Sequence, residues 1–289
     1  MRALGIIVLL VAALGAGYLG SRISQTGGAA TVQSESGFAR VMRTNTIRCG
    51  YYVYPPVTYR DANTGKLSGF SVDMMEKIAA KAGLTVEWTD EVNFGNWTQE
   101  LEAGRYDVAC TPMWPAIPLG RKALFTTPMF YSQIHVIGRA DETRFSSLAD
   151  LNKPEVKITV ADANETFYLA KEWFPNATIM TQPQNADGTQ VILDVITRKA
   201  DVMLSDLNAV AQWNKNNDRK IAVTAGGAVL KAMPFTLAVK ATDADLGNFL
   251  NTAIDDLNNT SAIPRLLDKW MEYKGVFSPV VAPYKVEGK

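Results

Sequence analysis

The chain has 289 residues, of which 47% are hydrophobic and 20% are charged, so its composition is that of a folded protein of roughly one to two domains and is too apolar for a disordered chain. The 29 basic residues balance the 29 acidic ones, which leaves no positive field to attract nucleic acid. Two cysteines and one histidine are too few for a Cys/His zinc site, a disulfide-rich scaffold or a histidine-based triad. We therefore expect no nucleic-acid partner, no metal site and no cofactor.

An export segment is predicted for residues 1–22. Arg2 precedes an uncharged apolar stretch over 3–21, and the next charge is that of Arg22. The stretch is intermediate in length between the apolar core of a signal peptide and the ~20 residues that span a bilayer, so it is either cleaved or kept as an inner-membrane anchor. A linker rich in Gly, Ser and Thr follows over 23–37. The rest of the chain is therefore expected to work in the periplasm.

Strand and helix patterns alternate after the linker. Runs rich in β-branched and aromatic residues predict strands, and apolar residues at helical spacing predict helices. The helix predicted over 71–82 has Ser71 as its expected N-cap and Gly83 as its stop. The first series of predicted elements is a strand over 46–52, the helix over 71–82, a strand over 85–88, a helix over 97–103 and a strand over 106–110.

The same alternation restarts near residue 155. The second series is a strand over 157–160, a helix over 165–173, a strand over 177–181, a helix over 188–197 and a strand over 200–204. A strand over 235–239 and helices over 245–257 and 263–271 complete the chain. Because β-α-β units build parallel sheets, the sequence predicts an α/β protein with two mostly parallel sheets, and the terminal elements must pack on one of them.

A series of short motifs occurs in a specific order along the chain. They are GKLSGFSVD over 65–73, Asp107, FTTP over 125–128, and Ala200-Asp201 followed by Asp206. Each motif is weak alone, but their order and spacing resemble those of the family 3 extracellular solute-binding proteins, the periplasmic amino-acid receptors of ABC importers. The resemblance extends from about residue 40 to about residue 270.

The resemblance implies a two-lobed fold of the type II periplasmic-binding-protein class, in which the chain crosses between lobes near 131–138 and near 231–235. Each lobe is expected to be a mostly parallel sheet flanked by helices. Lobe 1 would comprise residues 38–132 and, with the C-terminal helices, 234–279; lobe 2 would comprise 133–233, and 280–289 would be a tail.

A binding cycle and a set of partners follow from the same resemblance. The empty protein would open about the two crossings, and a ligand that contacts both lobes would favour a closed form. A permease of an ABC transporter in the inner membrane would recognise that closed form. The implied partners are thus a small-molecule ligand and this permease, and we expect the protein itself to be a monomer.

Ligand-facing positions of lobe 1 are also implied by the resemblance. Tyr51 stands where many relatives have Asp, Tyr54 stands where they have an aromatic residue that stacks on the ligand, and Phe94 matches a second aromatic wall. Thr111 and Trp114 belong to the ligand-facing segment after the third strand, and Trp114 replaces a hydroxyl there. Such rings can sandwich an apolar group or a cation. The alternative interpretation places these rings in the hydrophobic core.

The arginine that grips a ligand carboxylate in relatives has no counterpart in this sequence. Leu119 takes its position, and Ala116 takes that of a neighbouring threonine. Arg121 comes two residues late, and two residues of helix turn a side chain by about 200°, so Arg121 is expected to face elsewhere.

In lobe 2 the resemblance implies two acidic ligand-facing residues. Asn164 and Glu165 match a helix N-terminus, with Glu165 where relatives carry a hydroxyl, and Asp206 aligns with the carboxylate that receives the ligand's ammonium group. The alternative interpretation makes Glu165 a favourable partner of the helix dipole and Asp206 a helix N-cap. Two carboxylates and the rings, without the arginine, favour a cationic or amino-acid-like ligand, such as an amine, a quaternary ammonium compound or a basic amino acid.

Two other functions stay open. A few relatives with this fold are dehydratases, and Glu165 in a dry aromatic cleft could act as a general acid. A retained N-terminal segment would instead make the chain a membrane-anchored ligand-sensing domain. Ligand capture needs no covalent chemistry, so we expect a binding protein and not an enzyme.

The two cysteines lie on strands that are neighbours in the sheet of the resembling family. An oxidising compartment permits a disulfide between Cys49 and Cys110. Adjacent parallel strands, however, rarely offer the Cβ geometry that a bridge requires. Both states stay open from sequence, with free thiols the favoured expectation.

Overall fold

Helices and strands alternate along the chain in the computed structural model, which describes residues 35–92, 95–162, 164–183, 188–273 and 275–281. The chain from Gly37 onward forms one unit. The helices are α2 (Gly37–Thr44), α3 (Phe70–Ala82), α4 (Trp97–Glu102), α5 (Glu165–Trp173), α6 (Gly188–Ile196), α7 (Leu207–Asn216), α8 (Ala244–Asn259) and α9 (Ala262–Trp270). None of these described helices is both long enough and apolar enough to cross a membrane. The export segment over 1–22, most of the linker, most of the tail and Phe94 lie outside the described residues.

Within the described residues, eleven strands form one sheet, and its main path has the order β4-β1-β5-β12-β7-β10-β8-β9. The strands are β1 (Thr46–Tyr51), β4 (Thr85–Glu91), β5 (Val108–Met113), β6 (Ala123–Phe125), β7 (Phe130–Arg139), β8 (Lys157–Ala161), β9 (Thr178–Gln182), β10 (Val202–Asp206), β11 (Ile221–Val223), β12 (Val229–Lys240) and β13 (Ser278–Pro279). Strands β2 (Tyr59–Arg60) and β3 (Leu67–Ser68) form a separate pair.

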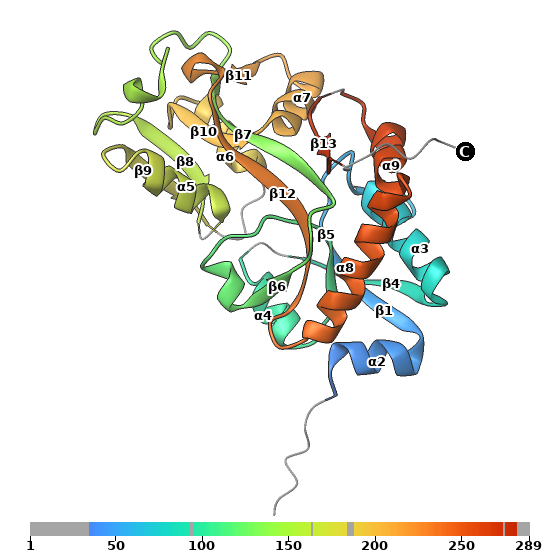
Figure 1. Cartoon of the computed structure of the whole chain (residues 1–289). Coiled ribbons are helices and arrows are strands. Elements are labelled where there is room, and N and C mark those ends of the chain that lie inside the picture. Colours follow the sequence, from blue (N-terminus) through green and yellow to red (C-terminus); the bar gives the residue numbers. More distant parts are fainter. Residues whose placement is uncertain (1–34, 93–94, 163, 184–187, 274, 282–289) are drawn as a thin grey trace, which may run out of the picture. The chain divides into compact units, whose positions relative to one another are not determined.

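Two parallel groups of strands are joined by an antiparallel pair. Strands β4, β1 and β5 run parallel, and so do β10, β8 and β9. The two groups are called the first and the second strand group below. Strands β12 and β7 lie between them and pair antiparallel with each other and with β5 and β10, respectively (Figure 1). The predicted α/β class is therefore confirmed, and the two predicted parallel sheets are joined by β12 and β7 into one sheet.

The expected crossings fall on the two long central strands. Residues 131–138 lie in β7 and residues 231–235 lie in β12. These strands pair from Phe130 opposite Phe235 to His135 opposite Val229. The assignment of residues to two lobes at these positions stays a prediction.

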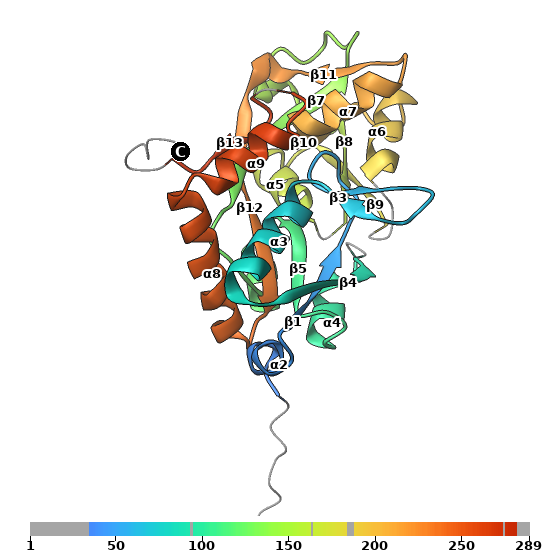
Figure 2. The ribbon, with the colours of Figure 1, turned by 90° about the vertical axis from the view of Figure 1, so that its right-hand side faces the viewer.

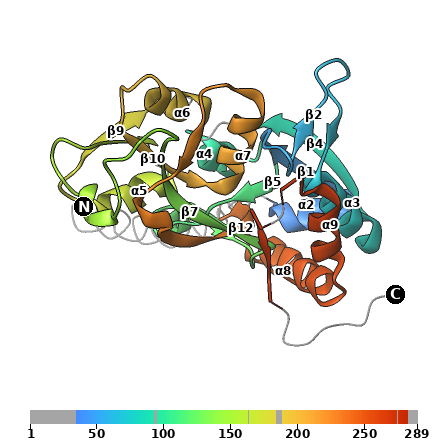
Figure 3. The same cartoon turned by 90° about the horizontal axis from the view of Figure 1, so that it is seen from above.

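Each strand group has its own hydrophobic core. Residues of α3, α8 and α9 pack with β1 and β5 in one cluster, and Figure 2 shows α8 and α9 beside α3. Residues of α5 pack with β8 and β10 in another. Figure 3 shows α5, α6 and α7 gathered around the second strand group. The C-terminal helices thus complete the core of the first group, although α3 precedes them by more than 150 residues of sequence.

Two local differences from the sequence-based expectations concern helices. Helix α3 begins at Phe70 with Gly69 as its N-cap, so the prediction that Ser71 caps it is wrong. Gly69 has φ 123°, and a Cβ there would lie 2.5 Å from the carbonyl oxygen of Val57, so only glycine fits this approach. Helix α7 was not predicted, although Leu207, Val210 and Trp213 recur at helical spacing and the last two pack, partly buried, against a hydrophobic cluster.

Cys49 and Cys110 form a disulfide, so the expectation of free thiols is wrong. Both side chains are fully buried, and their Cα atoms are 5.2 Å apart. In the parallel ladder the residue opposite Cys49 is Val108 and not Cys110. The unfavourable geometry of directly paired residues therefore does not apply, because the bridge joins positions that are offset along the two strands. It links β1 and β5 just before the loops that carry the predicted ligand-facing residues of the first group.

Candidate functional site

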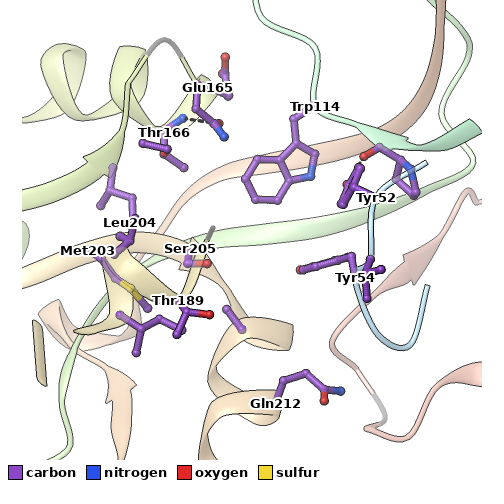
Figure 4. Close-up of a pocket in the computed structure, with 18 of the residues that line it drawn as sticks. Tyr52, Tyr54, Trp114, Glu165, Thr166, Thr189, Met203, Leu204, Ser205 and Gln212 are labelled. Atoms are coloured by element: carbon purple, nitrogen blue, oxygen red, sulfur yellow. Dashed lines mark hydrogen bonds between the residues drawn. The ribbon is translucent and has the colours of Figure 1, made fainter. Parts of the chain in front are cut away.

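A cavity of about 1120 Å³ is lined by residues from both strand groups. The first group contributes the loop after β1, the end of β5 and the following segment as far as Leu119. The second group contributes the N-terminal ends of α5 and α6, the end of β10 and one face of α7. Figure 4 shows Tyr52, Tyr54 and Trp114 on one side of this cavity, and Glu165, Leu204 and Ser205 on the other. The loops at the ends of parallel strands thus converge here.

An aromatic wall forms the first group's side of the cavity. Tyr54 stacks on Phe235 of β12, with ring centroids 6.5 Å apart and planes at 21°. Trp114 meets the same Phe235 edge-on, at 5.8 Å and 89°. Tyr52 lies beside Tyr54 at 6.1 Å. Phe235 itself does not line the cavity, so it acts as a rigid support for the two rings that do.

Two predicted site residues of the first group lie behind the cavity and not in its lining. Tyr51 packs edge-on against Trp88, at 6.2 Å. Thr111 is fully buried, and its hydroxyl accepts a hydrogen bond from the backbone N–H of Tyr52, at 3.2 Å. Tyr52, which the sequence analysis missed, lines the cavity in place of its neighbour. The adjacent Val53 and Tyr54 line the cavity as well, so no alternation along this loop marks Tyr52 in the sequence.

The segment after β5 brings Leu119, and not Arg121, to the cavity. Leu119 lines the cavity, whereas the exposed Arg121 is not among the lining residues. Among the described lining residues none is Lys, Arg or His, but two are carboxylates, Glu91 and Glu165. In the same part of the chain, no group of three or more His, Cys, Asp or Glu side chains could hold a metal ion. Both carboxylates are paired with a basic residue outside the lining, Glu91 with Arg60 and Glu165 with Lys231, so the lining offers acceptor oxygens and no basic group.

Glu165 lies at the N-terminal end of α5, where it lines the cavity with only 5% of its surface exposed. Its carboxylate forms an ion pair with Lys231 of β12, a partner that no local sequence pattern predicts. Burial raises the pKa of Glu165, and Lys231 opposes this effect only in part. The neighbouring Asn164 also lines the cavity and caps α5, because its side-chain oxygen accepts from the N–H of Thr166 at 3.3 Å. The negative charge of Glu165 is thus balanced by the ammonium group of Lys231.

Asp206 ends β10 and is fully buried. One carboxylate oxygen accepts from the N–H of Ala209 at 3.0 Å and so caps α7, as the alternative interpretation expected. The other accepts from the hydroxyl of Tyr54 at 2.6 Å and from that of Ser132 at 3.3 Å. Burial is the main cause that raises the pKa of Asp206. Asp206 does not line the cavity, whereas Tyr54, which binds it, does.

Comparisons with known proteins agree with this geometry. The model of the bacterial extracellular solute-binding proteins, family 3, matches residues 47–273. A "probable amino-acid ABC transporter-binding protein" of Haemophilus influenzae is 28% identical over 81% of this chain and 88% of its own length. The amino-acid-binding protein AabA of Dichelobacter nodosus is 25% identical over 74% of this chain and 83% of its own.

A solved structure is also similar over most of the chain. The crystal structure of an ancestral amino acid-binding protein, a precursor of cyclohexadienyl dehydratase, superposes with a TM-score of 0.69 and 25% identity. The superposition covers 82% of this chain and all of that one. The expected two-lobed α/β fold is thereby confirmed.

Proposed function

The chain belongs to the bacterial extracellular solute-binding proteins of family 3, and from this premise we propose that it captures a small cationic or amino-acid-like ligand and delivers it to an ABC transporter. The names of its relatives from Haemophilus influenzae and Dichelobacter nodosus, an amino-acid ABC transporter-binding protein and an amino-acid-binding protein, support this role. The family consists of binding proteins, and we propose that this chain likewise binds without catalysing a reaction. Its partners would be the ligand and an inner-membrane permease.

One observation carries the proposal: a large cavity that both strand groups line, with aromatic rings and carboxylates but no basic residue among its described lining. A ligand that contacts both groups stabilises their closed arrangement, which is how a binding protein signals occupancy to a permease. We place lobe 1 at 38–132 and 234–279, and lobe 2 at 133–233. The protein would act in the periplasm as a monomer, either released or anchored by its N-terminal segment.

The names of the relatives, which are binding proteins, do not favour the dehydratase alternative. Its general acid would be Glu165, which forms an ion pair with Lys231. Lys231 favours the ionised form of this carboxyl group, whereas burial favours the protonated form that a general acid requires and raises the pKa. The ligand-sensing alternative depends on residues 1–22, and mass spectrometry of the exported protein's N-terminus separates it from a released receptor.

Isothermal titration calorimetry tests the proposed function. The panel contains arginine, lysine, putrescine and choline as cations, glutamine as a neutral amino acid, and glutamate and aspartate as acidic ones. We expect micromolar or tighter binding of at least one cation and none of the acidic compounds. Tight binding of glutamate with no response to any cation would overturn the proposed ligand class.

Replacing Leu119 with arginine is expected to change ligand selectivity. The Leu119→Arg substitution brings a guanidinium into the cavity lining, where it repels a cation and can grip a carboxylate with two hydrogen bonds. Affinity for a cation without a carboxylate, such as putrescine, should fall about tenfold, which corresponds to ~1.4 kcal/mol. Affinity for amino acids that carry an α-carboxylate should rise relative to it. Calorimetry with both kinds of ligand measures the ratio, and Arg121→Leu, which alters a residue outside the lining, is the control.

Ligand affinity is expected to fall as the pH is lowered. Burial raises the pKa of Asp206 from its ordinary 3.8 and that of Glu165 from 4.5, so both take up protons at a higher pH than exposed carboxyls do. Each protonation removes a negative charge that attracts a cation. Because the folded state holds these protons more tightly than the unfolded chain, protonation of these two groups does not itself destabilise the fold. Calorimetry from about pH 8 to about pH 4 should show the dissociation constant rising with a midpoint above that of an ordinary carboxyl group, and melting curves at each pH confirm that the protein stays folded.

A further inference from the structure

A basic residue outside the cavity lining reaches one of the carboxylates that line it. Lys231 of β12 forms an ion pair with Glu165 at the start of α5. The pairing of β12 with β7 shifts its register at this point, since Val229 lies opposite His135 but Lys231 lies opposite Ile134. An irregularity of this kind changes the direction of the side chains beside it. The crossing strand thus brings an ammonium group of the protein itself to a carboxylate of the cavity.

This ion pair occupies only part of the Glu165 carboxylate. The ammonium group of Lys231 donates to Oε1, and no described residue donates a hydrogen bond to Oε2. Burial raises the pKa of Glu165, and Lys231 opposes this effect only in part. A buried carboxylate is most stable when both of its oxygens accept hydrogen bonds. Glu165 can therefore gain from a cation that makes more contacts than Lys231 does.

Lys231 is held less firmly than its partner. Its side chain is 37% exposed, whereas that of Glu165 is 5% exposed. A lysine ammonium is strongly hydrated and sits on a flexible stem, so it returns readily to water. Both residues fall within lobe 2 as placed above, so opening of the lobes does not part them. A ligand that enters the open protein would find Glu165 already paired.

The surroundings of Glu165 suit a planar cation. Figure 4 shows Trp114 on the side of the cavity opposite Glu165, and Trp114 packs against the hydrophobic cluster that includes residues of α5. A guanidinium group is planar, stacks on aromatic rings and can donate to both oxygens of one carboxylate. The single ammonium contact of Lys231 offers neither the stacking nor the second hydrogen bond.

We propose that Lys231 is an internal competitor of the ligand for Glu165, and that a cationic group of the ligand replaces it on binding. This inference rests on the proposed function, because it deepens the recognition of a cationic ligand at the same site. A ligand ammonium replaces one ammonium contact with another, whereas a guanidinium gains a second hydrogen bond and a contact with Trp114. The exchange therefore favours guanidinium compounds, such as arginine and agmatine, over lysine and putrescine.

Calorimetry and melting curves of Lys231→Met test this exchange. Methionine keeps an apolar stem and removes the charge. We expect affinity for arginine and agmatine to rise about tenfold, because no internal cation has to be displaced, while affinity for citrulline, the neutral analogue of arginine, changes less than about twofold. The ligand-free variant should melt at a lower temperature, because a buried carboxylate has lost its counterion. The titrations are run at about pH 8, which keeps the unpaired Glu165 ionised.

Two further variants separate this exchange from other effects of charge. Lys231→Arg should weaken binding of the same ligands, because an internal guanidinium can hold Glu165 with two hydrogen bonds. Arg60→Met is the matched control, since Arg60 pairs with Glu91, the other carboxylate of the lining. The side chains of that pair are 48% and 52% exposed, so water replaces the lost partner. Affinity for arginine should therefore change less than about twofold in Arg60→Met.

Three results would overturn the inference. A loss of arginine affinity in Lys231→Met, or a gain no larger than that in Arg60→Met, would show that Lys231 is only a structural counterion of Glu165. Tighter binding of lysine than of arginine by the unaltered protein would contradict the preference for a guanidinium. These two results leave the proposed function intact. If no cation binds either the unaltered protein or Lys231→Met at millimolar concentration, the proposed ligand class fails together with this inference.

Discussion

Replacing Cys49 and Cys110 with alanine is expected to lower the free energy of unfolding by about 4 kcal/mol. The disulfide closes a loop with a sequence separation of 61, and removing such a cross-link frees the unfolded chain to adopt many more conformations. For a chain of this size, the loss corresponds to a fall of about 10 °C in melting temperature. Urea denaturation of the double variant, followed by circular dichroism, measures the change.

A reductant provides the control for this prediction. It should destabilise the unaltered protein by about as much as the double substitution does, and it should leave the double variant unchanged. A double variant within about 1 kcal/mol of the unaltered protein would contradict the prediction, because it would show that the bridge does little to restrict the unfolded state. We expect the loss of binding free energy to be smaller than the loss of unfolding free energy, because neither cysteine lines the cavity.

Substituting Trp114 with alanine is expected to weaken ligand binding about 30-fold, or ~2 kcal/mol. Trp114 lines the cavity, and its edge-on contact with Phe235 holds the ring in place. Alanine removes the ring face that a bound cation would contact, together with apolar area that the ligand buries. Calorimetry with the strongest cation of the panel gives the ratio of dissociation constants, and Trp114→Phe should recover part of the loss.

Trp173 offers a matched comparison for that substitution. It lies at the C-terminal end of α5, a helix whose N-terminal end lines the cavity. Trp173 has 40% of its surface exposed and is not among the lining residues. Trp173→Ala should bind the ligand within about twofold of the unaltered protein, since a surface side chain away from the site contributes little to binding. Equal affinities of Trp114→Ala and the unaltered protein would show that the aromatic wall does not contact the ligand.

Local sequence patterns predicted most of the fold because periodicity and strand composition act over a few residues. Both parallel groups of strands were predicted, as were the helices that flank them, from apolar spacing alone. Helix α7 was missed, and most of its side chains are only partly buried. The disulfide was misjudged because its geometry depends on the offset between β1 and β5, which no local pattern encodes.

The sequence predicted which residues reach the cavity only where their place at the end of a strand or the start of a helix brings them there. Tyr54, Trp114, Asn164 and Glu165 reach the cavity because they stand at the ends of strands or the start of a helix. That they bind a ligand stays a prediction. Local sequence patterns could not predict side-chain partners that lie far apart in sequence. Glu165 and Lys231 are separated by 66 residues, and Tyr54 and Asp206 by 152. These two pairings decide the charge that the cavity presents, so the electrostatics of the site emerge only from the tertiary structure.

The antiparallel pairing of β7 with β12 gives the proposed movement a mechanical character. Because the two strands on which the expected crossings fall are hydrogen-bonded to each other, they form one continuous two-stranded ribbon. A two-stranded ribbon can twist and coil while the hydrogen bonds between its strands stay intact. Opening and closing would then bend the ribbon as one unit, and no backbone hydrogen bond between β7 and β12 would have to break for the ligand to be released.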